Sequence, residues 1–370
     1  MNHTRKIRVI ISGGGTGGHV FPAISVANAL RKAAPETEIL FVGASGRLEM
    51  EKVPAAGYNI VGLPVSGFNR TNIFRNIRVI FRLVRSLCLA GKILRDFRPD
   101  VAVGVGGYAS GPVLFRALTM GIPVLIQEQN SYAGITNRLL GRKASVICVA
   151  WDGMEKYFPA SKIIKTGNPV RKELENPGDL RNEALGYFGL ESGKPVVLVL
   201  GGSLGAGSIN RCLSSNIEKI AASNASWIWQ TGKYYFENIN ALVSVAGAGG
   251  VKVVPFIERM DYAYAAADII ISRAGAGTIS ELCLAGKPVV LVPSPNVAED
   301  HQTKNAQALS SEGGAVLVRD EEMEKTLLPE VFSLIEDENK RRILSENIRK
   351  MAVRDSDMII AQEILKLSER

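Results

Sequence analysis

The sequence predicts an α/β protein built from two Rossmann-like domains. Two stretches, Arg8–Pro22 and Pro195–Asn210, each run from an apolar strand into a glycine loop that opens a helix. Glycines at such a turn let a phosphate approach the backbone, and the helix N-terminus offers unpaired N–H groups. The two stretches lie about one domain length apart, so we expect two domains whose parallel sheets face a central cleft.

Apolar, β-branched runs alternate with helical patterns along the chain. Continuous apolar strands joined by helical crossovers are typical of parallel sheets that are covered on both faces. The expected strands are Ile7–Ser12, Glu38–Val42, Val101–Gly104, Pro123–Gln127, Val146–Ala150, Val196–Leu200, Ser226–Gln230, Val251–Pro255, Ile269–Ser272 and Pro288–Pro293.

The best domain boundary is the turn Thr166–Leu174, where the composition changes and a polar stretch follows. We therefore place the N-terminal domain at 1–168 and the C-terminal domain at 169–355. The segment 356–370 reads as a last amphipathic helix, with Ser356 or Asp357 as its N-cap.

The bulk composition excludes several classes of protein. The chain has 370 residues, of which 46% are hydrophobic and 22% charged, as in ordinary α/β proteins. Its four cysteines are scattered singly, which argues against a disulfide framework or a zinc site and fits a reducing cytoplasm. The first apolar stretch leads directly into a glycine loop, so it is a strand rather than a secretory signal. No uncharged apolar run approaches the roughly 18–20 residues that span a bilayer.

The first loop matches the pattern G-x-G-x-x-G through Gly13, Gly15 and Gly18. A dinucleotide site also needs an acidic residue about 20 positions further on, after the second strand. That strand ends in Phe41–Ser45, with no acidic residue to hold a ribose. An NAD-dependent oxidoreductase is therefore the weaker interpretation.

His19 follows this loop in the first helical turn and is one of three histidines in the chain. An imidazole with an ordinary pKa near 6.5 is a workable base near neutral pH, and a helix N-terminus favours its neutral form. The alternative is a histidine that only bonds to local backbone.

Polar side chains also follow a later strand of the first domain. The stretch Ile126–Arg138 supplies Glu128, Gln129, Asn130 and Asn137, and Gly107–Pro112 follows another strand. Open α/β sheets bind ligands at this carboxyl edge. Such turns are also often only solvated, so both interpretations stay open.

The stretch Ile270–Pro295 is more specific, because a strand, a glycine loop and a helix start follow one another. Loop amides can hold a diphosphate, and the Glu281 carboxylate can accept both hydroxyls of a ribose. The alternative for Glu281 is a capping-box partner near the helix start. His301, Gln302 and Asn305 follow the next strand and could bind sugar hydroxyls.

No metal site is expected. No Walker A sequence occurs, and the single D-x-D, Asp355–Asp357, lies at the start of the last helix and is read as helix capping.

The segment Phe68–Arg98 carries eight arginines and lysines against one aspartate. On a helix, one stripe holds Ile73, Ile77, Ile80, Val84 and Leu87, and the opposite side holds Arg75, Arg78, Arg82 and Arg85, with Phe74 and Phe81 between them. This pattern favours a helix that lies on an anionic membrane surface. The alternative is a helix that packs its isoleucine stripe on the sheet and exposes solvated arginines. Nucleic acid is not expected as a partner.

Seven ordered motifs then resemble one family. They are GGGTGGHVFP, VGVGGYASGP, EQNSYAGITNR, GNPVR, GGSLGAGSIN, SRAGAGTISEL and DHQTKNA. The chain resembles the bacterial MurG family, the undecaprenyldiphospho-muramoylpentapeptide β-N-acetylglucosaminyltransferases, from about Ile7 to the C-terminal helix.

The resemblance implies a GT-B fold whose C-terminal helix packs back on the N-terminal domain. It also implies a metal-independent, inverting transfer of N-acetylglucosamine from UDP-GlcNAc to the C4 hydroxyl of the muramoyl sugar of lipid I. This reaction makes lipid II for peptidoglycan synthesis, which serves cell shape and division, and needs no cofactor. The implied location is peripheral, on the cytoplasmic face of the plasma membrane. The implied partners are UDP-GlcNAc, the polyprenyl-linked lipid I, an anionic membrane surface and other cell-wall synthesis or division proteins.

The match also assigns site residues. His19 becomes the leading general base, with Glu128 as its rival or orienting partner. The nucleotide-sugar would be contacted from the C-terminal domain by Arg171, Ser203, the backbone at Ile257, Ala276, Gly277, Thr278, Ile279, Ser280, Glu281 and Gln302. From the N-terminal side it would be reached by Thr16, Gly17, Gly18 and Asn130, and Asn137 is a further substrate-binding candidate.

Two departures from the family pattern limit this assignment. Many relatives carry a polar residue where this chain has Leu204, and some have paired glutamines where it reads His301-Gln302-Thr303. A GT-B enzyme that glycosylates diacylglycerol and a non-catalytic nucleotide-sugar sensor remain as alternatives.

Overall fold

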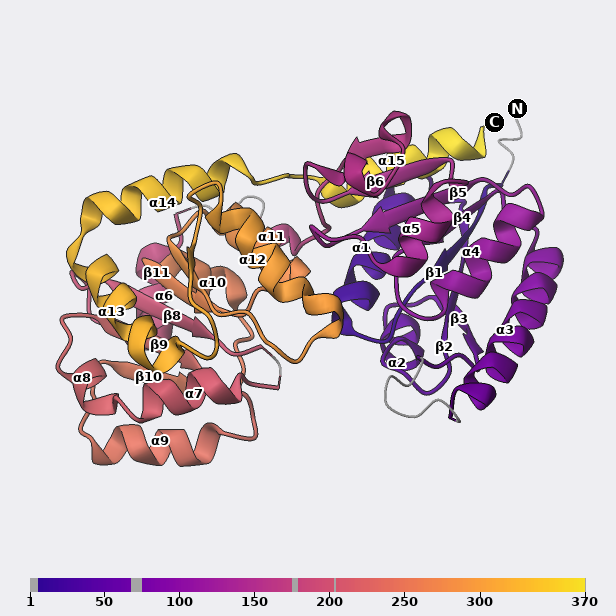
Figure 1. The fold of residues 1–370 in the computed structure, drawn as a ribbon. Helices are drawn as coiled ribbons and strands as arrows, with labels where there is room; N and C mark the ends of the chain where they lie inside the picture. Colours follow the sequence, from indigo (N-terminus) through magenta and orange to yellow (C-terminus); the bar gives the residue numbers. More distant parts are fainter. Residues whose placement is uncertain (1–5, 68–74, 175–178, 203, 370) are drawn as a thin grey trace. The chain divides into compact units, whose positions relative to one another are not determined.

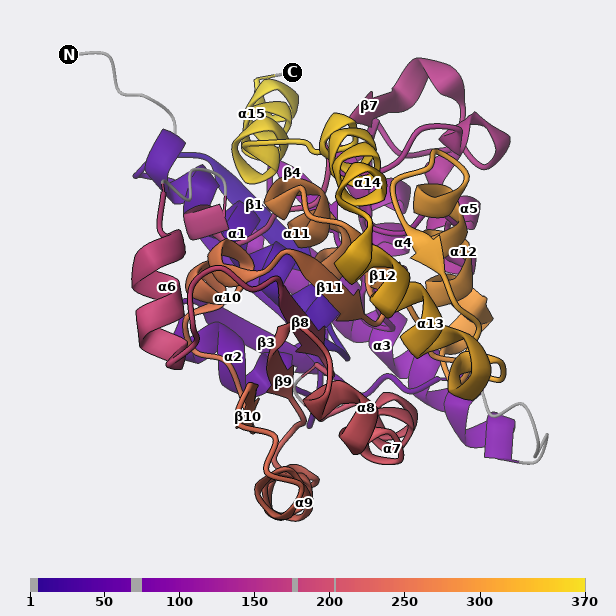
Figure 2. The same cartoon turned by 90° about the vertical axis from the view of Figure 1, so that its left-hand side faces the viewer.

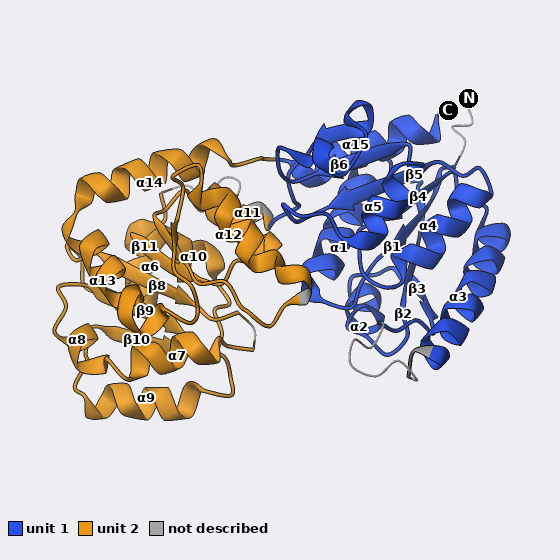
Figure 3. Ribbon diagram, in the orientation of Figure 1, with its two compact units in different colours: residues 1–170, 355–370 blue, residues 171–354 orange. Residues whose placement is uncertain are grey.

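The computed structural model describes residues 6–67, 75–174, 179–202 and 204–369. The chain forms two compact units (Figure 3). Unit 1 comprises Met1–Val170 and Asp355–Arg370, and unit 2 comprises Arg171–Arg354. The predicted residues Ile73, Phe74 and Ser203 lie outside the described residues, and the side chain of Arg75 is not described either.

Unit 1 contains a seven-stranded parallel sheet in the order β3-β2-β1-β4-β5-β6-β7. Strands β1 to β6 are labelled in Figure 1. Its strands are β1 (Arg8–Ser12), β2 (Glu38–Ala44), β3 (Asn59–Leu63), β4 (Val101–Gly104), β5 (Val124–Glu128), β6 (Val146–Val149) and β7 (Ile163–Lys165). Its α-helices are α1 (Gly17–Ala33), α2 (Glu49–Ala55), α3 (Arg75–Phe97), α4 (Ser110–Thr119), α5 (Ile135–Gly141) and α15 (Ser356–Ser368).

Helices cover both faces of this sheet because neighbouring residues of a strand point to opposite sides. In β1, Val9 and Ile11 join a core with residues of α1 and α15, whereas Ile10 joins a second core with residues of α3 and α4. The last helix, α15, packs against α1 and approaches β4.

Unit 2 contains a six-stranded parallel sheet in the order β10-β9-β8-β11-β12-β13. Its strands are β8 (Val196–Leu200), β9 (Ser226–Gln230), β10 (Val251–Val254), β11 (Ile269–Ser272), β12 (Val289–Leu291) and β13 (Val316–Leu317). Its α-helices are α6 (Arg181–Phe188), α7 (Gly207–Ser214), α8 (Ile217–Ala221), α9 (Phe236–Val245), α10 (Met260–Ala266), α11 (Ala276–Ala285), α12 (His301–Ser310), α13 (Met323–Glu336) and α14 (Glu338–Lys350). Helix α9 lies beside β10 (Figure 2).

The predicted fold class is confirmed, since both sheets are parallel and share the strand order of a Rossmann fold. The sequence missed β3, β7 and β13, which all lie at sheet edges. An edge strand has one neighbour and stays partly exposed, so it needs no continuous apolar run. The N-cap of α15 is Asp355, one residue before the predicted candidates.

Helix α3 presents its predicted apolar stripe away from the sheet. In the stripe, Ile77 is 66% exposed, Ile80 53% and Val84 54%, and Phe81 beside it is 72% exposed. The side chains that pack inwards are instead Val79, Ser86, Ala90 and Leu94. The alternative in which the isoleucine stripe packs on the sheet is therefore wrong. Within the described ranges, no helix is both long and apolar enough to cross a membrane.

Candidate active site

The predicted site residues of unit 1 gather at the carboxyl edge of its sheet. Thr16 is the N-cap of α1, and Gly17, Gly18 and His19 form its first turn. Glu128 ends β5, Asn130 lies in the loop that follows, and Asn137 lies in α5. Parallel strands bring these loops to one edge, as the sequence predicts.

The first glycine loop is packed against the loop that follows β4. Gly14 has a φ of 142°, and a Cβ on Gly107 would lie 2.2 Å from the Gly14 carbonyl oxygen. Two backbones can approach this closely only where neither side carries a side chain. The glycines therefore shape the loop that leads into α1.

Glu49 is a functional-site neighbour that the sequence analysis missed. Its side chain is almost fully buried, and its two carboxylate oxygens accept from the backbone N–H groups of Gly15 and Ala44, each at 2.8 Å. The Glu49 carboxylate thus lies where the backbone N–H groups of this glycine loop bind a negatively charged group. Glu49 follows the second strand, but with both oxygens held by backbone it is not placed like the ribose-binding acid of a dinucleotide site.

His19 contacts a glutamine rather than a carboxylate through Nδ1. Its Nδ1 lies 3.0 Å from Oε1 of Gln129, the residue that follows Glu128. The imidazole ring packs against Gly106, where a Cβ would lie 2.9 Å from the ring. Gln129 is therefore the residue whose bond orients this ring, a role that the sequence analysis gave to Glu128.

Glu128 instead organises the loop after β5. Its buried carboxylate accepts from the backbone N–H groups of Asn130 and Gly134, at 3.1 Å each, and from the side-chain amide of Asn137 at 2.8 Å. The Asn130 side chain adds a longer bond of 3.3 Å. The Oδ1 atom of Asn137 is buried and has no hydrogen-bond partner among the described residues.

In unit 2 the structure brings together two residues that the sequence predicts for one ligand. Nε of Arg171 lies 3.3 Å from Oε1 of Glu281, and the Tyr264 hydroxyl donates to Oε2 at 3.2 Å. Burial raises the pKa of Glu281, against the opposing effects of Arg171 and Tyr264. Burial and the Glu281 carboxylate also raise the pKa of Tyr264, which keeps its hydroxyl a donor.

Helix α11 begins at Ala276 with Gly275 as its N-cap, so Glu281 lies beyond the first turn. The alternative of a capping-box partner is therefore wrong, since that motif needs the acid at the third helical position. Ala276, Gly277 and Thr278 are partly exposed and form the first turn of this helix, whose N-terminal amides stabilise a negatively charged group.

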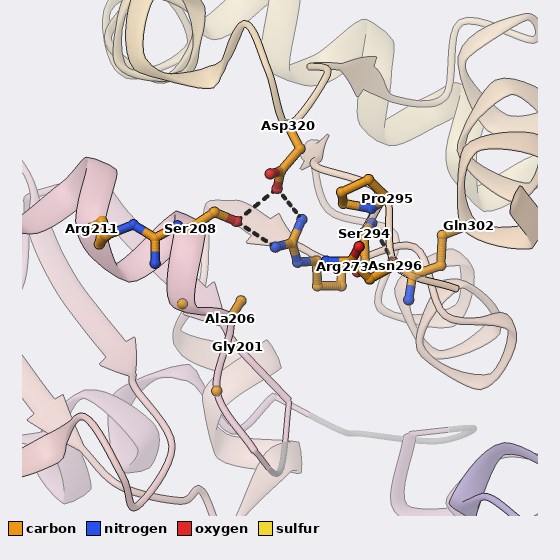
Figure 4. A pocket seen from close by; sticks show the side chains of 12 residues that line it. Gly201, Ala206, Ser208, Arg211, Arg273, Ser294, Pro295, Asn296, Gln302 and Asp320 are labelled. Atoms are coloured by element: carbon orange, nitrogen blue, oxygen red, sulfur yellow. Dashed lines mark hydrogen bonds and ion pairs between the residues drawn. The ribbon is translucent and has the colours of Figure 1, made fainter. Parts of the chain in front are cut away.

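A cavity of about 410 Å³ lies beside the second glycine loop (Figure 4). Its lining includes Gly205, Gly207, Arg211 and Ser294 together with the predicted Gln302. Gln302 accepts through Oε1 from the backbone N–H groups of Ala274 (3.2 Å) and Ser294 (2.8 Å), which ties two loops of the carboxyl edge together. Ile257, in the loop after β10, is buried.

Three further residues of this cavity were missed by the sequence analysis. Arg273 donates to Asp320 at 2.6 Å and to the Ser208 hydroxyl at 2.6 Å, and Ser208 donates to Asp320 at 2.7 Å (Figure 4). Arg273 also donates to the backbone oxygens of Val292 (3.0 Å) and Pro293 (3.1 Å), so its guanidinium ties together the loops that surround the cavity. Arg273 lies directly after β11, and this position could have marked it as a candidate site residue. Its partners Ser208 and Asp320 are distant in sequence and could not be predicted in the same way.

Among the residues that the structure describes, no cluster of three or more His, Cys, Asp or Glu side chains could hold a metal ion. Cys148, Cys212 and Cys283 are buried and Cys88 is exposed, all as free thiols.

Comparisons with known proteins show which family the two units match. Residues 9–149 match the glycosyltransferase family 28 N-terminal domain, and residues 196–362 match the family 28 C-terminal domain. A crystal structure of Acinetobacter baumannii MurG superposes with a TM-score of 0.82 at 30% identity, covering 97% of this chain and 99% of that one. A UDP-GlcNAc 2-epimerase from Neisseria meningitidis shares the fold, with a TM-score of 0.66 at 17% identity and coverage of 98% and 100%.

Sequence relatives are closer still. The UDP-N-acetylglucosamine–N-acetylmuramyl-(pentapeptide) pyrophosphoryl-undecaprenol N-acetylglucosamine transferase of Parabacteroides distasonis is 57% identical over 99% of this chain and 100% of its own length. The transferase of the same name from Bacteroides thetaiotaomicron is 55% identical, over 99% of both chains. Such identity along the whole length shows that this chain is a glycosyltransferase of the MurG family.

Proposed function

We propose that this protein transfers N-acetylglucosamine from UDP-GlcNAc to the C4 hydroxyl of the muramoyl sugar of lipid I, which yields lipid II and UDP. The observation that carries this proposal is the 57% identity over the full length of the Parabacteroides distasonis transferase. Glycosylation of diacylglycerol, the alternative acceptor, is not favoured by these relatives.

The donor is assigned to unit 2. Glu281 would accept the ribose hydroxyls, Arg171 would hold the carboxylate in place, and the backbone at Ile257 would contact the base. The run Ala276–Ser280, together with Ser203 and Gln302, would contact the remainder of the nucleotide-sugar. The cavity at the second glycine loop, which Gly205, Gly207 and Arg211 line, supports a diphosphate position there.

Transfer with inversion is one displacement at the anomeric carbon. The acceptor C4 oxygen forms a bond to that carbon and gives its proton to His19, while the bond to the diphosphate breaks and UDP leaves with its negative charge. Loop amides and the N-terminus of α11 stabilise that charge. Thr16, Gly17, Gly18, Asn130 and Asn137 would contact the substrates around His19.

The membrane contact is assigned to α3. Ile77, Ile80, Phe81 and Val84 are exposed on a helix whose Arg78, Arg82 and Arg85 are exposed as well. An apolar face flanked by basic residues suits the headgroup region of an anionic leaflet. Because the acceptor is anchored there by its polyprenyl chain, we place the enzyme peripherally on the cytoplasmic face of the plasma membrane.

The test is a transfer assay with labelled UDP-GlcNAc and a short-chain lipid I analogue. We expect a labelled disaccharide product, inverted at the anomeric carbon, and no product with diacylglycerol as acceptor. Activity should survive EDTA. Product formed only from diacylglycerol, or hydrolysis of the donor without transfer, would refute the proposal.

A further inference from the structure

A chain of buried side-chain amides lies behind His19 in unit 1. Gln127 and Gln129 come from the end of β5 and the residue after it, and Asn168 follows β7. All three are at most 2% exposed. We propose that Gln129 is a positioning residue that holds the neutral His19 imidazole with its proton on Nδ1, so that Nε2 carries the lone pair that takes the acceptor's proton. The role of Nε2 rests on the proposed function, whereas the position of the proton does not.

The first support is the bond between Gln129 and a backbone carbonyl. Nε2 of Gln129 lies 2.7 Å from the carbonyl oxygen of Val105, which can only accept. The amide nitrogen must therefore point at Val105, and the amide oxygen must point at His19. Because that oxygen also only accepts, the His19 Nδ1 atom, 3.0 Å away, has to be the donor.

A second backbone carbonyl fixes the same orientation from the other end of the chain of amides. Nδ2 of Asn168 donates to the Gln129 backbone oxygen at 3.0 Å, which leaves Oδ1 of Asn168 to accept from Gln127 at 2.8 Å. The remaining Gln127 oxygen then accepts from Nε2 of Gln129. The hydrogen bonds at both ends of this network therefore require the Gln129 side chain to point its Oε1 atom at His19.

Rotating the side-chain amide of Gln129 by 180° would be unfavourable because the amide is buried. A flipped amide would place its oxygen against the Val105 carbonyl and the Gln127 oxygen, which leaves buried acceptors unsatisfied. Gly106 packs against the ring and restricts it further. An amide also differs from the carboxylate of a Ser-His-Asp triad, because it orients the imidazole without adding a negative charge.

The protein itself, without substrate, tests the position of the proton. The chain has three histidines, so ¹⁵N-histidine labelling gives few imidazole signals, and the His19→Ala spectrum identifies those of His19. In the neutral ring, we expect Nδ1 of His19 to resonate as a protonated nitrogen and Nε2 as an unprotonated one. The reverse pattern would overturn the proposal.

Gln129→Met and Gln127→Met make a matched pair. Both remove a buried glutamine of the same network, but only Gln129 touches His19. In Gln129→Met the proton should no longer be confined to Nδ1, and kcat should fall by about 10- to 100-fold with UDP binding unchanged. In Gln127→Met, Gln129 keeps its bond to Val105, so the tautomer should persist and kcat should fall far less.

A double-mutant cycle separates positioning from general destabilisation. In the His19→Ala background, Gln129→Met should cause little further loss of kcat, since no imidazole remains to be oriented. An equal loss in both backgrounds, or an unchanged tautomer in Gln129→Met, would refute the role of Gln129. If His19→Ala instead had a near-normal kcat, the catalytic role of His19 would fail while the spectrum still reported the tautomer.

Discussion

Two buried carboxylates of unit 1, Glu49 and Glu128, differ from the partly exposed carboxylate of Glu281 in unit 2 in the acceptor oxygens that they leave for a ligand. Glu49 and Glu128 accept from backbone N–H groups and shape loops of unit 1. Glu281 is held by the side chains of Arg171 and Tyr264, with 17% of its own side chain exposed. Only Glu281 is therefore placed to exchange protein partners for the hydroxyls of a ligand.

Replacing Glu281 by alanine should raise the donor KM strongly and weaken the binding of UDP, because a two-oxygen contact to the ribose is lost. Titration calorimetry with UDP measures this effect. Glu183→Ala is a matched control in the same unit, since Glu183 also accepts from a tyrosine hydroxyl, at 3.0 Å from Tyr262, but on an exposed surface. Unchanged UDP affinity in Glu281→Ala would show that this carboxylate does not bind the ribose.

The same carboxylate predicts a pH effect on binding. Burial raises the pKa of Glu281, so the side chain becomes protonated at a higher pH than an ordinary glutamate as the solution is acidified. The protonated form has lost part of its accepting capacity. The affinity for uridine, which has no phosphate to titrate, should therefore fall as the pH drops through this raised pKa. In Glu281→Gln, uridine binding should be weak and independent of pH in this range.

His19→Ala should lower kcat by roughly 10²–10⁴-fold, the range typical for losing a general base. Donor affinity should change little, because the donor is assigned to unit 2. Single-turnover kinetics with saturating UDP-GlcNAc measure the chemical step. A near-normal rate would show that His19 is not the general base.

The composition of these sites was largely predictable from the sequence, but their contacts were not. Glycine loops after apolar strands indicated both sheet edges, and the residue types at those edges were visible. The partners were not visible, because His19 and Gln129 are 110 residues apart and Arg273 and Asp320 are 47 apart. Only the folded sheet decides which of many polar residues at an edge meet.

Helix α3 shows why the hydrophobic periodicity of a helix does not by itself give its orientation. The helix carries the isoleucine stripe and a second, less hydrophobic face that includes Ser86 and Ala90. The second face packs against α4 and the core beneath it, where small side chains allow close approach. The isoleucine stripe is therefore exposed. The arginines of the helix favoured this orientation in the sequence analysis, whereas the hydrophobic periodicity fits either orientation.

Replacing Arg75, Arg78, Arg82 and Arg85 by glutamine should abolish sedimentation with vesicles rich in cardiolipin or phosphatidylglycerol. Each basic residue near an anionic surface contributes about 1 kcal/mol, so four together decide binding. The control replaces Lys219, Lys252, Arg319 and Lys350, four exposed basic residues of unit 2. It removes the same charge and should leave sedimentation intact. Equal binding by the α3 variant and the wild type would show that its arginines are only solvated.

The same proposal has a readout in the unmodified protein. Cys88 is the exposed thiol of the four, and it follows Val84 by one helical turn on the exposed side of α3. Burial raises the pKa of Cys148 and Cys283 to about 12, so these thiols stay unreactive. A water-soluble maleimide should label Cys88 quickly, and anionic vesicles should slow that labelling, whereas phosphatidylcholine vesicles should not.

The two units share one strand order, but unit 1 is built from two separate parts of the chain and unit 2 from one. The chain leaves unit 1 after Val170 and re-enters it at Asp355, so α15 completes a core that the first part of the chain leaves open. Ile360, Ala361, Ile364 and Leu367 of α15 are buried in the core that contains β1 and α1. The stability of unit 1 therefore depends on the last residues of the chain.

Ile364→Ala should lower the stability of unit 1 by roughly 2–5 kcal/mol, as expected when a buried isoleucine leaves a cavity. Hydrogen exchange measured by mass spectrometry resolves the two units, because peptides from α1 and from β9 report on them separately. Exchange in α1 should accelerate, while β9, which carries the buried Trp227 and Trp229, should stay protected. Lys366→Ala, on the exposed side of the same helix, should change neither. Equal loss of protection in both units would show that α15 stabilises the molecule as a whole rather than the unit it rejoins.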